Sequence, residues 1–366
     1  MKKILIYSIY TTPYRFEPIQ ALKKEYSADV FYETCDGDYR NSKWFCKGDF
    51  FLLNTAEGRS YFNACKKKLK QYHLVVLFEF SLIESVKLIF ACRRLKVPYI
   101  LNCDGVMLFR HENFIKEAVK KYLIKGATAY FASGEHAKEY FIRYGAKKER
   151  IYFHNFTTLH KKNILSEPIS LERKLEIRKK LNLPIDGKIC IAVGRYIPLK
   201  RYDVLLKLWK DMPKNDYLLL VGGGPEKENY ESIIRKFNLS NVILDDFHPF
   251  EELLEYYKAS DLFVHPTSYD VWGLVINEAM ACGLPVVVTD TCVAGLELVN
   301  NGENGYVIHL GEGDAFVRRI VEILNDDGLR EKMAHHSIET IQPFNMENMI
   351  DSHLKTVHTV MEKNAK

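Results

Sequence analysis

The hydrophobic positions of this 366-residue chain fall in short runs, separated by stretches with helical spacing. Continuous apolar runs of this length predict buried strands of a parallel sheet covered on both faces. In the first half the expected strands are Ile4–Ile9, Val30–Tyr32, Leu74–Phe78, Tyr99–Leu101 and Ala129–Ala132, and the expected helices include Glu17–Tyr26, Ile83–Leu95 and Asn113–Lys125. This alternation is typical of an α/β unit.

A second series of the same kind begins near residue 187. Between the two series, residues 151–165 look irregular, and a charged helix is expected over Leu171–Leu181, ending before Pro184. The chain should therefore form two doubly wound, Rossmann-like domains, over 1–165 and 187–342, with a linker at 166–186 and ligands at the carboxyl ends of the strands. The strands of the second series are expected at Ile189–Val193, Tyr217–Val221, Val242–Leu244, Leu262–His265, Val286–Thr289 and Tyr306–His309, and a terminal helix at Met346–Glu362.

Composition excludes several classes of protein. With 47% hydrophobic and 27% charged residues, the chain matches a globular protein and not a disordered one. No apolar run approaches the roughly 18 residues of a membrane span, and the first residues read as a strand, not as a signal peptide. The eight cysteines form no CxxC pair, so we expect reduced thiols and no zinc site.

Charge is divided unevenly along the chain. Residues 1–165 hold 29 Lys and Arg against 16 Asp and Glu, and the remainder holds 23 against 31. A basic half suggests an anionic partner, namely nucleic acid, an acidic membrane surface or a phosphorylated substrate, although an ordinary solvated basic surface explains it equally well. The basic stretches Ala64–His73 and Lys116–Ala127 are partly amphipathic and suit an anionic leaflet or plain solvent.

The segment Ser268–Asp290 is the most informative for chemistry. Its pattern predicts a turn through Gly273, a helix over Leu274–Cys282 and a buried strand after Pro285. The first amides of that helix, on Gly273, Leu274 and Val275, form a site for phosphate together with the helix dipole. Glu278 lies little more than one turn inside and can accept hydrogen bonds from sugar hydroxyls, unless it is a solvated surface carboxylate.

Two further segments follow strands of the second half. Gly194, Arg195 and Lys200 lie in the loop after one strand, where a guanidinium and an ammonium suit a diphosphate. The alternative is a pair of solvated loop cations. Gly222-Gly223-Gly224-Pro225 follows the next strand, and its glycines let a backbone approach a ligand closely. These glycines do not form GxGxxG, which excludes a dinucleotide dehydrogenase.

Taken in order, these motifs resemble the retaining GT-B-fold glycosyltransferases of family 4, also called glycosyl transferases group 1. The resemblance is close over about residues 187–310 and loose elsewhere. It implies two Rossmann-like domains facing a central cleft, with the terminal helix, about 343–366, returning to the first domain. The matching residues are Gly194-Arg195-x4-Lys200, Gly222–Pro225, Glu251–Pro266, Asp270-x7-Glu278 continuing as AMACGLPVV, and Gly302–Tyr306.

The resemblance also implies roles for individual residues. Arg195 and Lys200 would hold the donor diphosphate, Glu278 the ribose, and the amides around Gly273–Val275 the phosphate or sugar. Gly194 and Gly223 belong to the same donor site, and Phe247 and His248 would hold the base mainly through backbone. No divalent metal or other cofactor is implied, because cations and a helix N-terminus neutralise the departing diphosphate.

The chain departs from the family pattern at two places that matter for catalysis. The first acid of the E-x7-E motif is Asp270, which resembles a subgroup carrying WGLV-x-NEAMA, here Trp272–Ala281. The first-domain His of the family is replaced by Asp104, which either contacts the sugar at the reacting carbon or caps the segment that follows it.

The function implied is a retaining transfer from a nucleoside diphosphate sugar, foremost a UDP-sugar, to a glycan or a polyprenyl-diphosphate-linked acceptor. Such a transfer would belong to the synthesis of a cell-surface polysaccharide, such as lipopolysaccharide or capsule. The location would be cytoplasmic, peripheral on the inner face of the membrane, and no nucleic acid is expected as a partner. A non-catalytic sugar-nucleotide-binding subunit that supports a partner transferase is the alternative.

Overall fold

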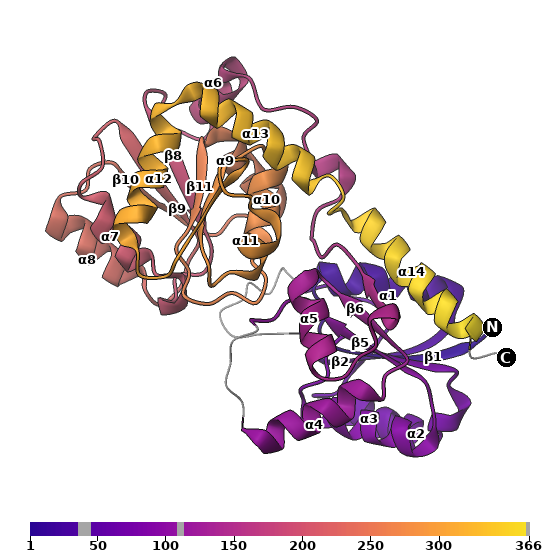
Figure 1. Ribbon diagram of the computed structural model, residues 1–366. Helices are drawn as coiled ribbons and strands as arrows, with labels where there is room; N and C mark the ends of the chain where they lie inside the picture. Colours follow the sequence, from indigo (N-terminus) through magenta and orange to yellow (C-terminus); the bar gives the residue numbers. More distant parts are fainter. Residues whose placement is uncertain (36–44, 108–112, 364–366) are drawn as a thin grey trace. The chain divides into compact units, whose positions relative to one another are not determined.

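The computed structural model describes residues 1–35, 45–107 and 113–363. The chain divides into two compact units, one made of 1–158 with 344–366 and the other of 159–343. Each unit is a parallel sheet with helices on both faces, so the α/β expectation of two doubly wound domains is confirmed (Figure 1). The last three residues of the expected terminal helix segment, 364–366, lie outside the described residues.

Unit 1 has a seven-stranded sheet in the order β3-β2-β1-β4-β5-β6-β7, with every pair parallel. The strands are β1 Lys3–Tyr10, β2 Ser27–Thr34, β3 Phe51–Leu52, β4 Leu74–Leu77, β5 Tyr99–Cys103, β6 Ala129–Ala132 and β7 Ile151–Phe153. The helices are α1 Pro13–Glu25, α2 Ala56–Lys67, α3 Ile83–Leu95, α4 Phe114–Lys125, α5 Glu135–Arg143 and α14 Met346–Lys363, with short 3-10 turns at Leu69–Gln71 and Lys148–Arg150.

The core of unit 1 lies on both faces of this sheet, as the continuous apolar runs predict. Successive residues of β1 alternate between the two faces: Leu5 joins the cluster under α2 to α5, and Ile6 joins the cluster under α1 and α14. The terminal helix α14 supplies Val357 and Val360 to that second cluster, so it covers a face of the first unit's sheet, beside α1. Burying these side chains stabilises the docking of α14 by roughly 1.5–3 kcal/mol each.

Unit 2 has a six-stranded parallel sheet in the order β10-β9-β8-β11-β12-β13. The strands are β8 Lys188–Val193, β9 Asp216–Val221, β10 Val242–Asp245, β11 Leu262–His265, β12 Val286–Thr289 and β13 Gly305–Ile308. The helices are α6 Leu171–Lys180, α7 Tyr202–Trp209, α8 Lys227–Phe237, α9 Phe250–Ala259, α10 Leu274–Ala281, α11 Val293–Leu298, α12 Gly313–Asn325 and α13 Asp327–Ile341, with 3-10 turns at Lys161–Asn163 and Pro198–Lys200.

The segment 166–186, expected as a linker, belongs to unit 2 instead. Its helix α6 is fixed by Arg178, whose guanidinium donates to Asp261 Oδ2 at 2.6 Å and to the Ala259 carbonyl at 2.8 Å. Lys174 of the same helix donates to Asp261 Oδ1 at 2.7 Å. The buried Asp261 carboxylate and its two cationic partners hold the helix in place. A local sequence pattern cannot predict this contact, because Asp261 is more than 80 residues away from the helix.

Several short elements were not expected from the sequence. The strand β3 has two residues and β7 has three, which is too short for a periodic pattern, and α2 was recognised only at its basic end. Helix α1 begins at Pro13, four residues before the expected start, because proline at the first helical position loses only an N–H that has no partner there. The other expected strands are confirmed within a few residues at their ends.

The strand order places a topological switch point in each unit. In unit 2 the chain starts at β8 and winds outward through β9 and β10 on one side and through β11, β12 and β13 on the other. Doubly wound sheets bind ligands outside the carboxyl ends of the two central strands at such a point. The corresponding strands of unit 1 are β1 and β4. Within the described part of the chain, none of the helices is long and apolar enough to span a bilayer.

Candidate functional site

A charged cluster lies at the switch point of unit 2. Lys200, in the loop after β8, donates from Nζ to Asp270 Oδ2 at 2.6 Å, and Asp270 follows β11. The same ammonium lies 3.4 Å from Nε2 of His265, the last residue of β11. Nε2 of His265 also lies 3.5 Å from Asp270 Oδ2, so the ring lies against both members of the ion pair. Two adjacent strands thus join a cation, a carboxylate and an imidazole.

Burial and mutual charge set the protonation of this cluster. His265 is fully buried, and burial together with the Lys200 charge lowers its pKa to about 4. The pKa of Asp270 is lowered well below its usual range because Lys200 and His265 outweigh the opposing effect of burial. Near neutral pH the cluster therefore holds one ammonium and one carboxylate that face each other, so Asp270 positions Lys200.

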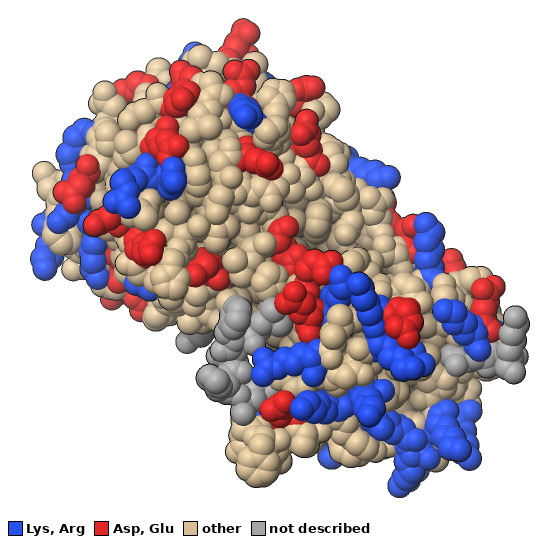
Figure 2. Space-filling view, viewed as in Figure 1, with Lys and Arg blue, Asp and Glu red and all other residues tan. Residues whose placement is uncertain are grey.

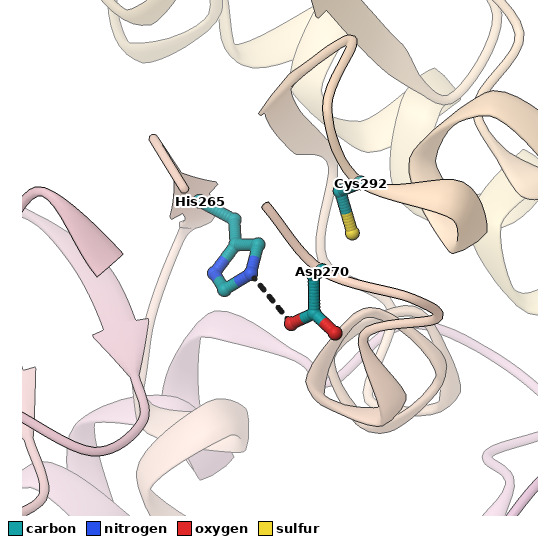
Figure 3. A group of neighbouring side chains, drawn as sticks. All are labelled: His265, Asp270 and Cys292. Carbon is teal, nitrogen blue, oxygen red and sulfur yellow. Dashed lines mark ion pairs between the residues drawn. The ribbon is translucent and has the colours of Figure 1, made fainter. Parts of the chain in front are cut away.

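The donor atoms of His265, Asp270 and Cys292 lie within 4.8 Å of one another, which raises the question of a metal ion (Figure 3). Two observations show that these residues do not fit one. The Lys200 ammonium already takes Asp270 Oδ2, the position that a cation would need. Burial raises the pKa of the Cys292 thiol, whose Sγ donates to the Trp272 carbonyl at 3.0 Å, whereas a metal binds the thiolate.

The amino end of α10 lies directly after Asp270. Gly273 precedes the helix with φ 104°, and a Cβ there would lie 2.6 Å from Cys292 Sγ, so the position requires glycine. Trp272 donates its indole N–H to Asn277 Oδ1 at 3.0 Å, which ties the start of the motif to the helix. The first helical amides, those of Gly273, Leu274 and Val275, have no acceptor within the helix and offer a site for an anion.

Glu278 lies one turn into α10 and is only 8% exposed. Its Oε2 accepts a hydrogen bond from the Tyr257 hydroxyl at 3.0 Å. This bond fixes one carboxylate oxygen of Glu278 in a set orientation. A fixed carboxylate near a helix amino end is suited to accept hydrogen bonds from ligand hydroxyl groups, as expected from the sequence.

The glycine-rich turns after β8 and β9 pack against each other. A Cβ on Gly222 would lie 2.0 Å from the Gly194 carbonyl, and a Cβ on Gly224 would lie 2.6 Å from the Tyr196 carbonyl. Gly194 leaves room for the Tyr202 hydroxyl, which would be 2.9 Å from a Cβ at that position. Gly223 differs because nothing lies within 4 Å of its Cβ position. Gly222 and Gly224 are thus required for packing, while Gly223 faces open space.

The other expected donor-site residues lie at the same edge of unit 2. Arg195 is exposed in the loop that carries Lys200. Phe247 and His248 follow β10, at the outer edge of the sheet, and Phe247 is 53% exposed. The His248 ring stacks on Tyr256 at 4.5 Å and contacts Asp245 Oδ1 at 3.2 Å. An exposed phenyl ring with a fixed imidazole beside it offers surface for a planar base.

Asp104 lies in unit 1, after β5, and its carboxylate forms an ion pair with the guanidinium of Arg15 from α1. Arg15 is 5% exposed and rests over the Phe78 ring at 4.9 Å, and burial lowers its pKa to about 10. Asn102 donates to Asp104 Oδ1 at 2.8 Å, and His154 Nε2 lies 3.9 Å from that oxygen. Asp104 is therefore the counter-ion of a buried arginine, a role that the sequence did not suggest.

Buried polar groups collect around this ion pair at the carboxyl ends of the unit 1 strands. Native proteins satisfy most buried polar atoms with protein, water or ligand partners, so these atoms can take hydrogen bonds from water or from a ligand. The buried atoms without a hydrogen-bond partner among the described residues include Ser8 Oγ, Thr11 Oγ1, Thr12 Oγ1, Asn102 Oδ1, Ser133 Oγ and both ring nitrogens of His154.

Four contributors to these clusters, namely His265, Tyr257, Arg15 and His154, were given no role from the sequence. His265 ends the expected strand Leu262–His265, and Arg15 lies before the expected helix Glu17–Tyr26. His154 is fully buried beside Asp104. The one available signal was position, because His265 ends a strand and His154 directly follows one.

Most of unit 2 matches a family model, and curated relatives match about half of the chain. Residues 173–340 match the model of the glycosyl transferases group 1. The lipopolysaccharide core biosynthesis glycosyltransferase LpsE of Rhizobium meliloti is 31% identical over 185 residues, which cover 49% of this chain and 52% of LpsE. The N-acetyl-alpha-D-glucosaminyl L-malate synthase of Bacillus anthracis is 26% identical over 211 residues, 56% of this chain and 55% of that protein. The chain thus spans about half the length of these curated relatives.

Solved structures resemble the chain over its whole length. The HepE protein of Anabaena in complex with UDP has a TM-score of 0.77 and 19% identity, covering 98% of this chain and 100% of that chain. The lipopolysaccharide outer core galactosyltransferase WaaB has a TM-score of 0.69 and 15% identity, covering 98% and 99%. At these identities the likeness establishes the fold, which is GT-B.

Proposed function

We propose that this chain is a retaining glycosyltransferase that takes a sugar from a nucleoside diphosphate sugar, with a UDP-sugar as the first donor to test. The observation that carries the proposal is the Lys200–Asp270 pair at the switch point of unit 2. It lies within the matched segment 173–340, beside the amino end of α10. The UDP present in the HepE structures supports the choice of donor.

The donor diphosphate would be neutralised by three groups, two from the loop after β8 and one from the start of α10. Arg195 offers a planar guanidinium, Lys200 a positioned ammonium, and α10 its first free amides. Charge builds on the β-phosphate as the glycosidic bond breaks, so fixed positive groups stabilise the transition state more than the bound donor. These residues remove the need for a divalent metal, and we propose that none is used.

The rest of the donor would be held by the neighbouring residues. Glu278, oriented by Tyr257, accepts hydrogen bonds from the ribose hydroxyls, and Gly223 allows its backbone to approach the ligand. Phe247 and His248 flank the base. The pairing of Asp270 with Lys200 and of Trp272 with Asn277 supports a subgroup of the family in which an aspartate replaces the first glutamate of the motif.

Retention of configuration is proposed from the resemblance to the retaining family, and the absence of a placed nucleophile in this cluster bears on the route by which retention would occur. Asp270 is engaged by Lys200, and Glu278 by Tyr257, so neither carboxylate of the described site is poised to attack a sugar carbon. The reaction would instead proceed by front-face displacement: the leaving phosphate accepts the proton of the acceptor hydroxyl while that oxygen bonds to the same face of the sugar. Both the broken and the formed bond then lie on one side of the ring.

The acceptor would bind at the carboxyl ends of the unit 1 strands. The buried, unpartnered hydroxyl groups around Arg15 and Asp104 suit a hydroxyl-rich glycan. A polyprenyl-diphosphate-linked glycan is the acceptor that we propose, which agrees with the charge of the first half of the chain. We propose a cytoplasmic enzyme, peripheral on the inner face of the membrane, that contributes to a cell-surface polysaccharide such as lipopolysaccharide or capsule.

The test is a donor screen on the purified chain. UDP-sugars, GDP-sugars and other donors are compared for thermal stabilisation, and each stabilising donor is then supplied in radiolabelled form to follow sugar release and transfer. Turnover by the chain alone supports the enzyme. Binding without hydrolysis or transfer would favour the alternative, a non-catalytic sugar-nucleotide-binding subunit, and no binding of any donor would refute both.

A further inference from the structure

A basic hollow lies on unit 1, away from the carboxyl ends of its strands. It has a volume of about 360 Å³ and is bounded by α3, by α4 and by the end of α5. Four of its seven lining residues carry a positive charge and none is acidic. The lining residues are Arg93, Lys121, Tyr122, Lys125, Arg143, Tyr144 and Gly145.

The environment of the Arg93 guanidinium is the feature of the hollow that suggests a bound anion. Its guanidinium rests on the Tyr122 ring at 3.7 Å, which holds the plane of the group in place. Its Nη1 is buried and has no hydrogen-bond partner among the described residues. A buried, charged donor without an acceptor is costly, and an anionic oxygen supplied from outside would satisfy it. Gly126 makes room for this arrangement, since a Cβ there would lie 2.8 Å from Arg93 Nη1.

The lysines of the hollow keep their charges available at its rim. Lys121 is 53% exposed and reaches Glu117 on its own helix at 2.9 Å, an exposed pair of little strength. The stem of Lys125 lies beside Gly145, 3.6 Å from a Cβ built at that glycine. A single compact anion in the hollow would meet several positive charges at once, which is the arrangement that phosphate groups require.

The same helices expose apolar side chains beside the hollow. On α4, Phe114 is 76% exposed and Ile115 58%, and Phe90 of α3 stacks on Tyr122 at 4.9 Å while remaining 44% exposed. Phe114, Lys121, Tyr122 and Lys125 recur at helical spacing and share one side of α4. Figure 2 shows Lys and Arg gathered where α2, α3 and α4 lie in Figure 1. Large exposed apolar groups next to cations are the features of a surface that enters the interface of a bilayer.

We infer that this hollow is a binding site for the phosphate of an anionic phospholipid headgroup, with the apolar side chains of α4 inserted beside it. The inference rests on the proposed membrane location, because the membrane is the source of the phosphate. The residues of the hollow are those that would recognise that phosphate. It is separate from the donor and acceptor sites. A soluble phosphate compound has the same charge but makes no use of Phe114 and Ile115, so the lipid is the occupant that accounts for both features.

The experiment compares two double variants that remove the same charge from unit 1. Lys121→Gln with Lys125→Gln alters the hollow, and Lys67→Gln with Lys68→Gln alters exposed lysines at the end of α2. Co-sedimentation is measured with phosphatidylcholine vesicles and with phosphatidylcholine vesicles that contain phosphatidylglycerol. We expect the hollow variant to bind the anionic vesicles about tenfold more weakly than the wild type, and the α2 variant to lose no more than about threefold.

Further measurements distinguish a lipid phosphate from a soluble one, and failure of the site from failure of the membrane location. Phe114→Ser should weaken vesicle binding without changing the response to glycerol phosphate, and UDP affinity should be unchanged in every variant. Equal losses in the two double variants would overturn the site but leave a membrane-bound transferase. Failure of the wild type to prefer anionic vesicles would overturn both the site and the proposed location. A third outcome is that glycerol phosphate stabilises the wild type and not the hollow variant, while no variant changes vesicle binding. That outcome would overturn the lipid as the ligand and assign a soluble phosphate compound to the hollow.

Discussion

The ammonium of Lys200 lies 2.6 Å from a carboxylate oxygen of Asp270, and the pair joins the loop after β8 to the segment after β11. From the sequence, both residues were expected in the donor site, with no pairing between them. Their pairing gives them different roles. Lys200 presents its positive charge to the ligand, and Asp270, together with His265, keeps the ammonium in place. Preorganised charge of this kind costs no reorganisation when the donor reacts.

Arg195→Ala and Lys200→Ala should each reduce transfer by two to three orders of magnitude. Each change removes one charge-assisted contact to the phosphate on which charge develops, which is worth about 2–4 kcal/mol. Steady-state kinetics with the best donor measure the loss, and Lys210→Ala, an exposed lysine of the same unit, is the control. Unchanged turnover in the Arg195→Ala, Lys200→Ala double variant would refute the donor-site assignment.

Tyr257→Phe should weaken nucleotide binding about threefold to tenfold, and Glu278→Gln more strongly. The first change removes the hydroxyl that orients the carboxylate, a bond worth about 1 kcal/mol, and the second removes the charged acceptor itself. Calorimetric titration with UDP measures both, with Glu251→Gln on the exposed start of α9 as the control. If UDP binds the Glu278→Gln variant as it binds the wild type, the ribose contact is wrong.

Gly222→Ala and Gly223→Ala should separate packing from ligand binding. The Gly222 change places a Cβ 2.0 Å from the Gly194 carbonyl oxygen, which is a severe clash. Unit 2 should therefore lose several kcal/mol of stability or fail to fold. The Gly223 change meets nothing within 4 Å, so stability should be kept while UDP binding falls. Urea unfolding and UDP titration read the two effects. Full UDP affinity in the Gly223→Ala protein would remove that glycine from the donor site.

Asp104→Asn should destabilise unit 1 by about 3–5 kcal/mol because it leaves the buried Arg15 guanidinium without its counter-ion. Replacing both residues, as in Arg15→Met with Asp104→Leu, should recover part of the lost stability because the unpaired buried charge disappears. The unfolding free energies of the two variants give the comparison. An Asp104→Asn protein of normal stability but without transferase activity would restore a direct catalytic role for Asp104.

Acid should destabilise the protein through its buried histidines. Burial lowers the pKa of His353 to about 4, whereas the unfolded chain binds that proton near pH 6.5. Since the unfolded state binds the proton first, this contribution to stability is fully present above about pH 6.5 and is lost as pH falls toward about 4, by roughly 3 kcal/mol. The variant His353→Phe, whose ring would join Phe78 and Phe131, should flatten the dependence. An equal slope in urea unfolding of both proteins would contradict this assignment.

The architecture could be predicted from the sequence for a local reason. Parallel strands covered on both faces must be apolar throughout, so their number and order along the chain appear as runs of hydrophobic residues. Gly194 and Lys200 lie in the loop after a strand, and Glu278 lies near the start of the helix that follows another strand; the carboxyl ends of parallel strands meet at one edge of the sheet. Residues can therefore be assigned to one site before their contacts are known.

Pairings between distant segments were decided only by the tertiary structure. Lys200 meets Asp270 because β8 lies beside β11, and Tyr257 meets Glu278 because α9 contacts α10. Arg15 of α1 meets Asp104, which follows β5. The same holds for α6, which looked like a linker until Arg178 met Asp261. Hydrophobic period reports which face of an element is buried, but it carries no information about the partner that covers it. Partner choice depends on how whole elements pack, and that is settled by the fold.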